Sequence, residues 1–181
     1  MAKKYPGTPA IWASVSRLAE VLGDVERSWV ALTRAIALTP DNPAFRAISL
    51  ITAVDHLSVE KADQHLRQTF SVLAASEAEV SLMYAFAEIA LSERSRVGKR
   101  HRLQRALEAV NAAFPKARSE WVQKHLRAVK MFLDASTKNE EADPNLLYRA
   151  GLPRLAATST RDPIGALRTE AIARIHEQIA A

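Results

Sequence analysis

The stretch that decides the fold is 12–42, WASVSRLAEVLGDVERSWVALTRAIALTPDN. Its large apolar residues recur every three or four positions, which is the spacing of one face of an α-helix. Gly23 and Asp24 interrupt this pattern, since a glycine ends helices in the left-handed conformation and an aspartate caps the next helix. Pro40 ends the second run, because proline cannot continue a helix. The stretch therefore predicts two antiparallel helices joined by a tight turn.

The same helical spacing continues along the rest of the chain, with Gly, Pro and Ser between the runs. Strand signals are scarce, since period-two alternation is rare and Asn-Gly or Asp-Gly hairpin turns are lacking. The sequence therefore predicts an all-α fold. The expected helices are Pro9–Leu22, Val25–Leu38, Pro43–His56, Val59–Ala75, Ser76–Leu91, Lys99–Ala113, Ser119–Asp134, one or two short helices within 145–157, and Pro163–Ile179.

Residues 12–42 resemble a tetratricopeptide repeat, a helix-turn-helix unit with a period of about 34 residues. The matching positions are Trp12, Gly23, Asp24, Ser28, Trp29, Leu32, Ala35, Ile36 and the closing segment Leu38–Asn42. Later steps of the same period fit less well. The resemblance implies antiparallel helix-hairpin repeats stacked as a short α-solenoid over 9–134. An N-terminal arm over 1–8 precedes it, and a loop with a C-terminal capping helix over 135–181 follows it.

In proteins with such repeats, the first helix of each pair lines a concave face that receives peptides. The resemblance places six candidate peptide-binding residues there: Arg17, Ile48, Ile51, Leu82, Ala85 and Ile89. This face is mostly apolar and suits an amphipathic helix. The chain's own helix Pro163–Ile179 is one candidate, either folding back as a cap or exchanging between the protomers of a homo-oligomer. A partner protein or peptide is the other.

Positive charge is concentrated in residues 94–130, where eleven Lys or Arg stand against two acids in a chain of net charge +5. Such a block attracts anionic partners. The candidate anion-binding residues are Arg94, Arg96, Lys99, Arg100, Arg102, Arg105, Lys124 and Arg127. Nucleic acid and an acidic or phosphorylated protein segment are the two expected partners. An ordinary solvated surface on two Arg-rich helices is the third interpretation.

Signatures of chemistry are lacking. The chain has no cysteine, which excludes thiolate metal sites and cysteine nucleophiles, and its five glycines are too dispersed for a phosphate-binding loop. The five histidines lack metal-ligand spacing. We therefore expect no cofactor, no metal and no catalysis, and predict a protein–protein interaction module, an adaptor or scaffold. The alternative is a nucleic-acid-associated protein. No apolar stretch is long enough to span a membrane, and the expected location is the cytoplasm.

Overall fold

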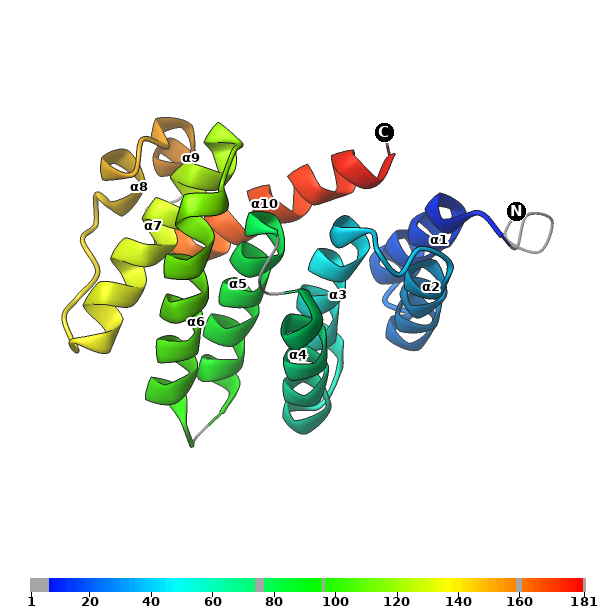
Figure 1. Cartoon of the computed structure of the whole chain (residues 1–181). Coiled ribbons are helices and arrows are strands. Elements are labelled where there is room, and N and C mark those ends of the chain that lie inside the picture. Colours follow the sequence, from blue (N-terminus) through cyan, green and yellow to red (C-terminus); the bar gives the residue numbers. More distant parts are fainter. Residues whose placement is uncertain (1–6, 74–76, 96, 159–160, 181) are drawn as a thin grey trace.

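The computed structural model describes residues 7–73, 77–95, 97–158 and 161–180 (Figure 1). Within these ranges the chain forms helices and no strands, which confirms the all-α fold class. The α-helices are α1 (Pro9–Val21), α2 (Val25–Leu38), α3 (Pro43–His56), α4 (Val59–Leu73), α5 (Ala78–Arg94), α6 (Lys99–Ala113), α7 (Glu120–Thr137), α8 (Leu146–Arg149), α9 (Pro153–Thr158) and α10 (Pro163–Ala180). A 3₁₀ turn, η1 (Phe114–Lys116), follows α6.

Local signals set the ends of these helices. Gly23 adopts a positive φ of 74° after α1, and Asp24 Oδ1 accepts a hydrogen bond of 3.1 Å from the backbone N–H of Arg27 at the start of α2. Asn42 caps α3 in the same way. Helix α7 continues to Thr137, three residues beyond the predicted end. The predicted start of the fifth helix, Ser76, lies outside the described residues, and α5 is described from Ala78.

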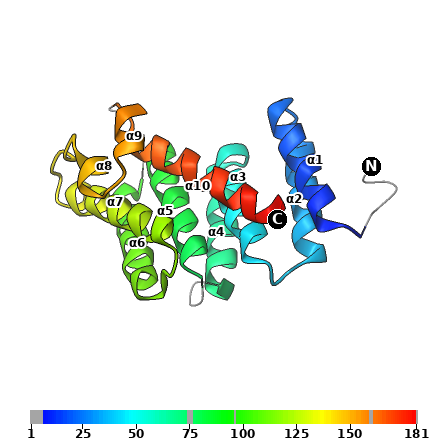
Figure 2. The same ribbon diagram turned by 90° about the horizontal axis from the view of Figure 1, so that it is seen from above.

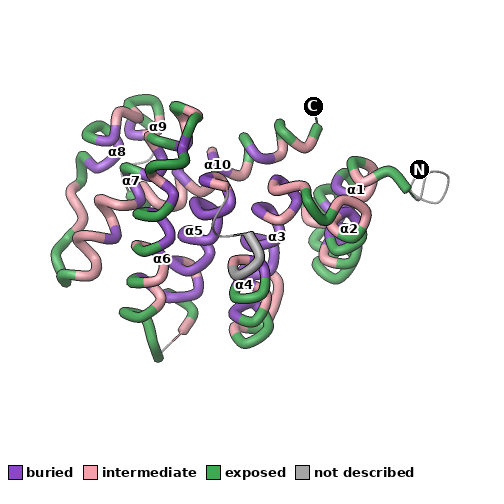
Figure 3. The backbone as a smooth tube through the Cα atoms, viewed as in Figure 1, coloured by how far each residue is buried: buried purple, intermediate pink, exposed green. Residues whose placement is uncertain are grey.

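The helices pack largely in chain order, from α1 and α2 at one end to α7 at the other (Figure 1). Each helix from α1 to α6 packs against the next, and α3, α5 and α7 also pack against one another in turn. Helix α5 is buried at almost every position from Ala78 to Ser92, because neighbouring helices surround it. In Figure 3 most of α5 is coloured as buried, in the middle of the molecule.

Helix α10 does not extend the row of helices but crosses it (Figure 2). It packs against α3, α5 and α7, and its C-terminal part reaches α1. Its buried residues, Leu167, Ala171 and Ile175, follow the spacing i, i+4, i+8 of one helical face. The chain thus folds back on itself through its last helix, one of the two arrangements expected for this segment. Exchange of the helix between protomers stays a prediction.

Helix α1 turns a different side inward from the one that its apolar spacing indicates. Leu18 and Leu22 belong to the apolar spacing of residues 12–42, which predicts that they face inward, yet they are 60% and 72% exposed. The residues that α1 buries are the small Ala13, Ser16 and Ala19. Small side chains let α1 and α2 approach closely, and the hydroxyls of Ser16 and Ser28 meet at 3.0 Å between the two helices.

Candidate functional site

The residues predicted to bind a peptide lie on α1, α3 and α5, and five of the six are buried. Ile48 and Ile51 share one face of α3, and Leu82, Ala85 and Ile89 share one face of α5. These five belong to the same apolar cluster as Leu167, Ala171 and Ile175 of α10. Arg17 alone is exposed. The side of α3, α5 and α7 on which α10 packs, called the α10-binding face below, is therefore covered by the chain itself.

Polar contacts accompany this apolar packing at several points along α10. Arg168 binds the carboxylate of Asp55, which lies on the same face of α3 as Ile48 and Ile51 by its spacing. Nearer its C-terminus, α10 brings His176 into the electrostatic range of Arg17 and Glu20 on α1. Glu20 also accepts a hydrogen bond of 3.3 Å from Thr52 on α3. The interactions of Arg168 and His176 place α10 relative to α3 and α1.

His125 of α7 faces α10 from inside the core. Its side chain is fully buried, and its Nδ1 lies 2.7 Å from the backbone carbonyl of Trp121, to which Nδ1–H donates. The other ring nitrogen, Nε2, has no hydrogen-bond partner and lies 3.6 Å from Glu170 Oε2 on α10. Burial lowers the pKa of His125, and the Trp121 carbonyl and Glu170 offset only part of this effect. His125 is therefore neutral at pH 7.

A network of charged side chains fills the contact between α4, α5 and α6. Glu88 of α5 is fully buried and accepts hydrogen bonds from Arg105 Nε at 2.8 Å and from the Tyr84 hydroxyl at 2.7 Å. Arg102 donates to Asp63 of α4 at 2.6 Å and to Glu88 at 3.2 Å. Burial opposes ionisation of Asp63, but its bonds with Arg102 and Arg67 hold its pKa below the ordinary value. The network joins three helices through paired charges.

Sequence reasoning missed this network, because its members are far apart in the chain. One signal was present, since Glu88 is the only acid within the apolar run from Val80 to Leu91. A single acid at such a position requires a buried cationic partner, because an unpaired buried charge is costly. The identity of that partner depends on the packing of α6 against α5.

The residues of the predicted anion-binding segment do not form one open patch. Arg102 and Arg105 belong to the internal network, and Arg94 donates to the backbone carbonyls of Val54 and Leu57, where α3 ends. Lys124 pairs with Glu120 at 2.8 Å on the surface of α7. Three others, Lys99, Arg100 and Arg127, are exposed, and Arg96 lies outside the described residues. The structure thus uses three of these arginines to hold helices together.

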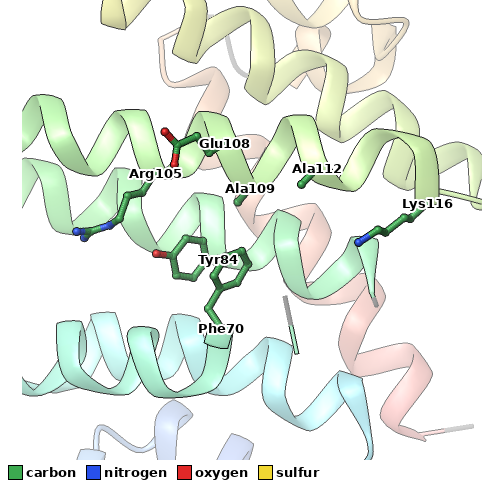
Figure 4. A pocket seen from close by; sticks show the side chains of 7 residues that line it. All are labelled: Phe70, Tyr84, Arg105, Glu108, Ala109, Ala112 and Lys116. Carbon is green, nitrogen blue, oxygen red and sulfur yellow. The ribbon is translucent and has the colours of Figure 1, made fainter. Parts of the chain in front are cut away.

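A pocket of about 510 Å³ opens beside the network, between α4 and α6 (Figure 4). The rings of Phe70 and Tyr84 are stacked at 3.9 Å along it. Its other lining residues are Arg105, Glu108, Ala109, Ala112 and Lys116. The volume is that of a small-molecule site. Of the predicted anion-binding residues only Arg105 lines it, and its guanidinium already binds Glu88 and Asp63.

Ser49 and His65 pair a hydroxyl with an imidazole, the two groups of a nucleophile and its base. Their Oγ and Nε2 atoms lie 3.0 Å apart between α3 and α4. Ser49 is fully buried, and its hydroxyl donates to the carbonyl of Arg46 at 2.8 Å. His65 Nε2–H must therefore donate to Ser49, so its proton is on the wrong atom for a base. The pair joins two helices.

In the part of the chain that the structure describes, no three His, Asp or Glu side chains gather closely enough to hold a metal ion. In the same ranges, none of the helices combines the length and the apolar character needed to cross a membrane. The resemblance of residues 12–42 to a tetratricopeptide repeat stays an interpretation of the sequence. No family model, no curated protein and no solved structure matches the chain.

Proposed function

We propose that this protein is a non-catalytic protein–protein interaction module, an adaptor or scaffold, whose α10-binding face accepts an amphipathic helix. The observation that supports this proposal is the seating of α10 itself, which buries Leu167, Ala171 and Ile175 across α3, α5 and α7. A partner helix with the same apolar spacing competes with α10 for this face. Helix-in-groove recognition works in this way, through apolar anchors one helical turn apart.

The chemistry of the α10-binding face favours exchange of one helix for another. An ion pair between Arg168 and Asp55 holds α10 to α3. The Arg168 side chain is 26% exposed and the Asp55 side chain is 40% exposed. Such partly exposed ion pairs contribute about 0–1 kcal/mol. The apolar stripe therefore supplies most of the binding energy, and apolar contacts are not specific to one sequence. A partner needs the stripe, and it does not need the ion pair.

Covalent attachment favours α10 over any free competitor. A short linker holds a tethered segment at an effective concentration of about millimolar. A free partner must therefore bind the α10-binding face much more tightly than α10 does, or bind when the contacts of α10 with this face are weakened. The protein in this proposal is closed at rest and opens when a suitable helix arrives. The basic segment 94–130 does not support a separate function as strongly, because Arg94, Arg102 and Arg105 bind groups of the chain itself.

The test uses a labelled synthetic peptide with the sequence of α10 and the full-length chain. Ala171→Glu places a charge in the buried stripe of α10, whereas Ala173→Glu places the same charge on its exposed side. We expect the peptide to bind the Ala171→Glu chain, measured by fluorescence anisotropy, and to bind the wild type and the Ala173→Glu chain at least tenfold more weakly. Circular dichroism checks that all three chains are folded.

A second experiment locks α10 onto the α10-binding face instead of displacing it. Because the chain has no cysteine, Asp55→Cys and Arg168→Cys introduce the only thiols, and a short bis-maleimide joins α10 to α3. The cross-linked chain carrying Ala171→Glu should lose the peptide binding that the uncrosslinked chain shows. If the folded Ala171→Glu chain binds no peptide, the α10-binding face does not accept a helix in trans and the proposal is wrong.

A further inference from the structure

The outer face of α1 is a second apolar surface, separate from the α10-binding face. It consists of Ala10, Ile11, Ser14, Leu18, Val21 and Leu22. Leu18, Val21 and Leu22 are 60%, 77% and 72% exposed, and three such residues together form an uncommon surface on a monomer. The packing of α1 against α2 uses the opposite side, where Ala13, Ser16 and Ala19 are buried.

This outer face carries no charge along its length. Its one polar side chain, Ser14, donates its hydroxyl to the carbonyl of Ala10 at 2.9 Å. Burying the face in an interface would therefore leave no hydroxyl without a partner, which removes the usual cost of covering a polar group. The nearest charged residues of the helix, Arg17 and Glu20, lie at the edge that faces α3 and α10. A partner for this face must likewise be apolar and uncharged.

Side-chain size changes from one end of the face to the other. The N-terminal half presents the small Ala10 and Ser14 beside the half-buried Ile11, and the C-terminal half presents the large and exposed Leu18, Val21 and Leu22. When α1 of a second copy runs antiparallel to the first, its large C-terminal residues lie on the small N-terminal residues of the first copy. The large residues of the first copy lie in turn on the small residues of the second. In that arrangement, Leu18 of each copy meets Ser14 of the other, and the opposed helix dipoles also attract. The face is complementary to itself.

We propose that the outer face of α1 binds the same face of a second copy, with the two α1 helices antiparallel across a twofold axis. Such an interface is isologous, as in most homodimers. The three large residues of each copy, with their small neighbours, would bury roughly 1,000 Å² in total, at the low end for specific interfaces. Interfaces of this size are typical of weak, transient complexes, so we expect the dimer to dissociate on dilution.

The first test measures sedimentation of the full-length chain over micromolar to hundred-micromolar concentrations. Leu18→Glu places a charge at the centre of the face, and Val97→Glu, at an apolar residue that is 84% exposed, is the matched control. We expect the wild type and Val97→Glu to dimerise with rising concentration. Leu18→Glu should weaken the dimer at least tenfold, because an unpaired buried carboxylate costs more than one decade in affinity. Both positions are exposed, so both chains should stay folded.

The second test fixes the orientation of the two helices. Ser14→Lys and Leu18→Glu, made in separate chains, should each be monomeric. When they are mixed, the new lysine of one chain should meet the new glutamate of the other, and a mixed dimer should form. Helices in parallel would not bring these positions together, so a mixture that stays monomeric overturns the antiparallel pairing.

Two other results would overturn the proposal as a whole. One is a wild-type chain that stays monomeric at the highest concentration. The other is a dimer that Leu18→Glu leaves intact but that the cross-link between positions 55 and 168 abolishes, since that dimer would form by exchange of α10. The first result leaves the peptide test of the α10-binding face unaffected, because that test measures a different surface. The second would place α10 of one copy on the α10-binding face of another, so it would overturn the pairing of the α1 helices and support the proposed function.

Discussion

Arg168 of α10 binds both carboxylate oxygens of Asp55 on α3, a residue 113 positions earlier in the chain. This contact joins the last helix of the chain to the third and places α10 across the row of helices. Because Asp55 shares its face of α3 with Ile48 and Ile51, the ion pair also marks the edge of the apolar surface that α10 covers. The contact therefore links the position of α10 to the availability of the α10-binding face.

Arg168→Ala should loosen α10 without unfolding the rest of the chain. The expected loss of stability is about 0.5–1 kcal/mol, because both side chains of the pair are partly exposed. Hydrogen exchange followed by mass spectrometry should show faster exchange in 163–180 and little change in α6. Asp55→Ala should have the same effect, and the double variant should be no worse than either single one, since the two residues act together. Additive effects would show that the pair does not couple α10 to α3.

Glu88→Ala should be strongly destabilising. Removal of this buried carboxylate leaves Arg102 and Arg105 partly unpaired at the contact of three helices, and breaking a buried pair costs about 3–5 kcal/mol. Glu93→Ala, at an exposed position of the same helix, should change stability by less than about 0.5 kcal/mol. Urea denaturation of the full chain measures both. Equal effects at the two positions would contradict the structural role of the network.

Arg100 and Arg102 of α6 should likewise differ in how much their replacement lowers stability. Arg102 is 11% exposed and binds two carboxylates, whereas Arg100 is exposed to solvent. Arg102→Ala should lower the free energy of unfolding by about 1.5–3 kcal/mol, the range for hydrogen bonds to charged groups. Arg100→Ala should leave thermal stability unchanged. A loss at Arg100 as large as that at Arg102 would show that the basic segment is not divided between interior and surface.

Stability should fall as the solution is acidified below about pH 6.5, the ordinary pKa of histidine. Burial lowers the pKa of His65, His125 and His176 in the folded chain. Below pH 6.5 the unfolded chain binds protons that the folded chain does not, so protonation favours unfolding. Above that pH all three are neutral in both states and the effect vanishes. Each histidine contributes at most about 1.4 kcal/mol per pH unit.

His176→Gln provides the check on this pH dependence. His176 faces Arg17, which lowers its pKa together with burial, and Glu20, which raises it. The variant should show a shallower fall in the free energy of unfolding between neutral pH and the range where carboxylates titrate. Unfolding in urea at a series of pH values measures the slope. An unchanged slope would mean that His176 takes up its proton equally in the folded and unfolded chains.

The helices themselves could be predicted from local residues. Gly23, Asp24 and Asn42 act on backbone groups within three or four positions, so the ends of α1, α2 and α3 follow from their neighbours alone. Apolar spacing found α10 for the same reason, since a helical face is a property of one short segment. The candidate peptide-binding residues were placed by resemblance on α1, α3 and α5, and the structure puts α10 against these helices.

Which face of each helix is buried, and which charges meet, was decided only by the tertiary structure. Helix α1 turns Ala13, Ser16 and Ala19 inward and leaves Leu18 outside, because at the end of the row its neighbours among the described residues lie on one side. Arg102 and Glu88 form a pair because α6 packs on α5. Local sequence determines backbone geometry through short-range sterics and hydrogen bonds, whereas burial and ion pairing depend on residues brought together from distant parts of the chain.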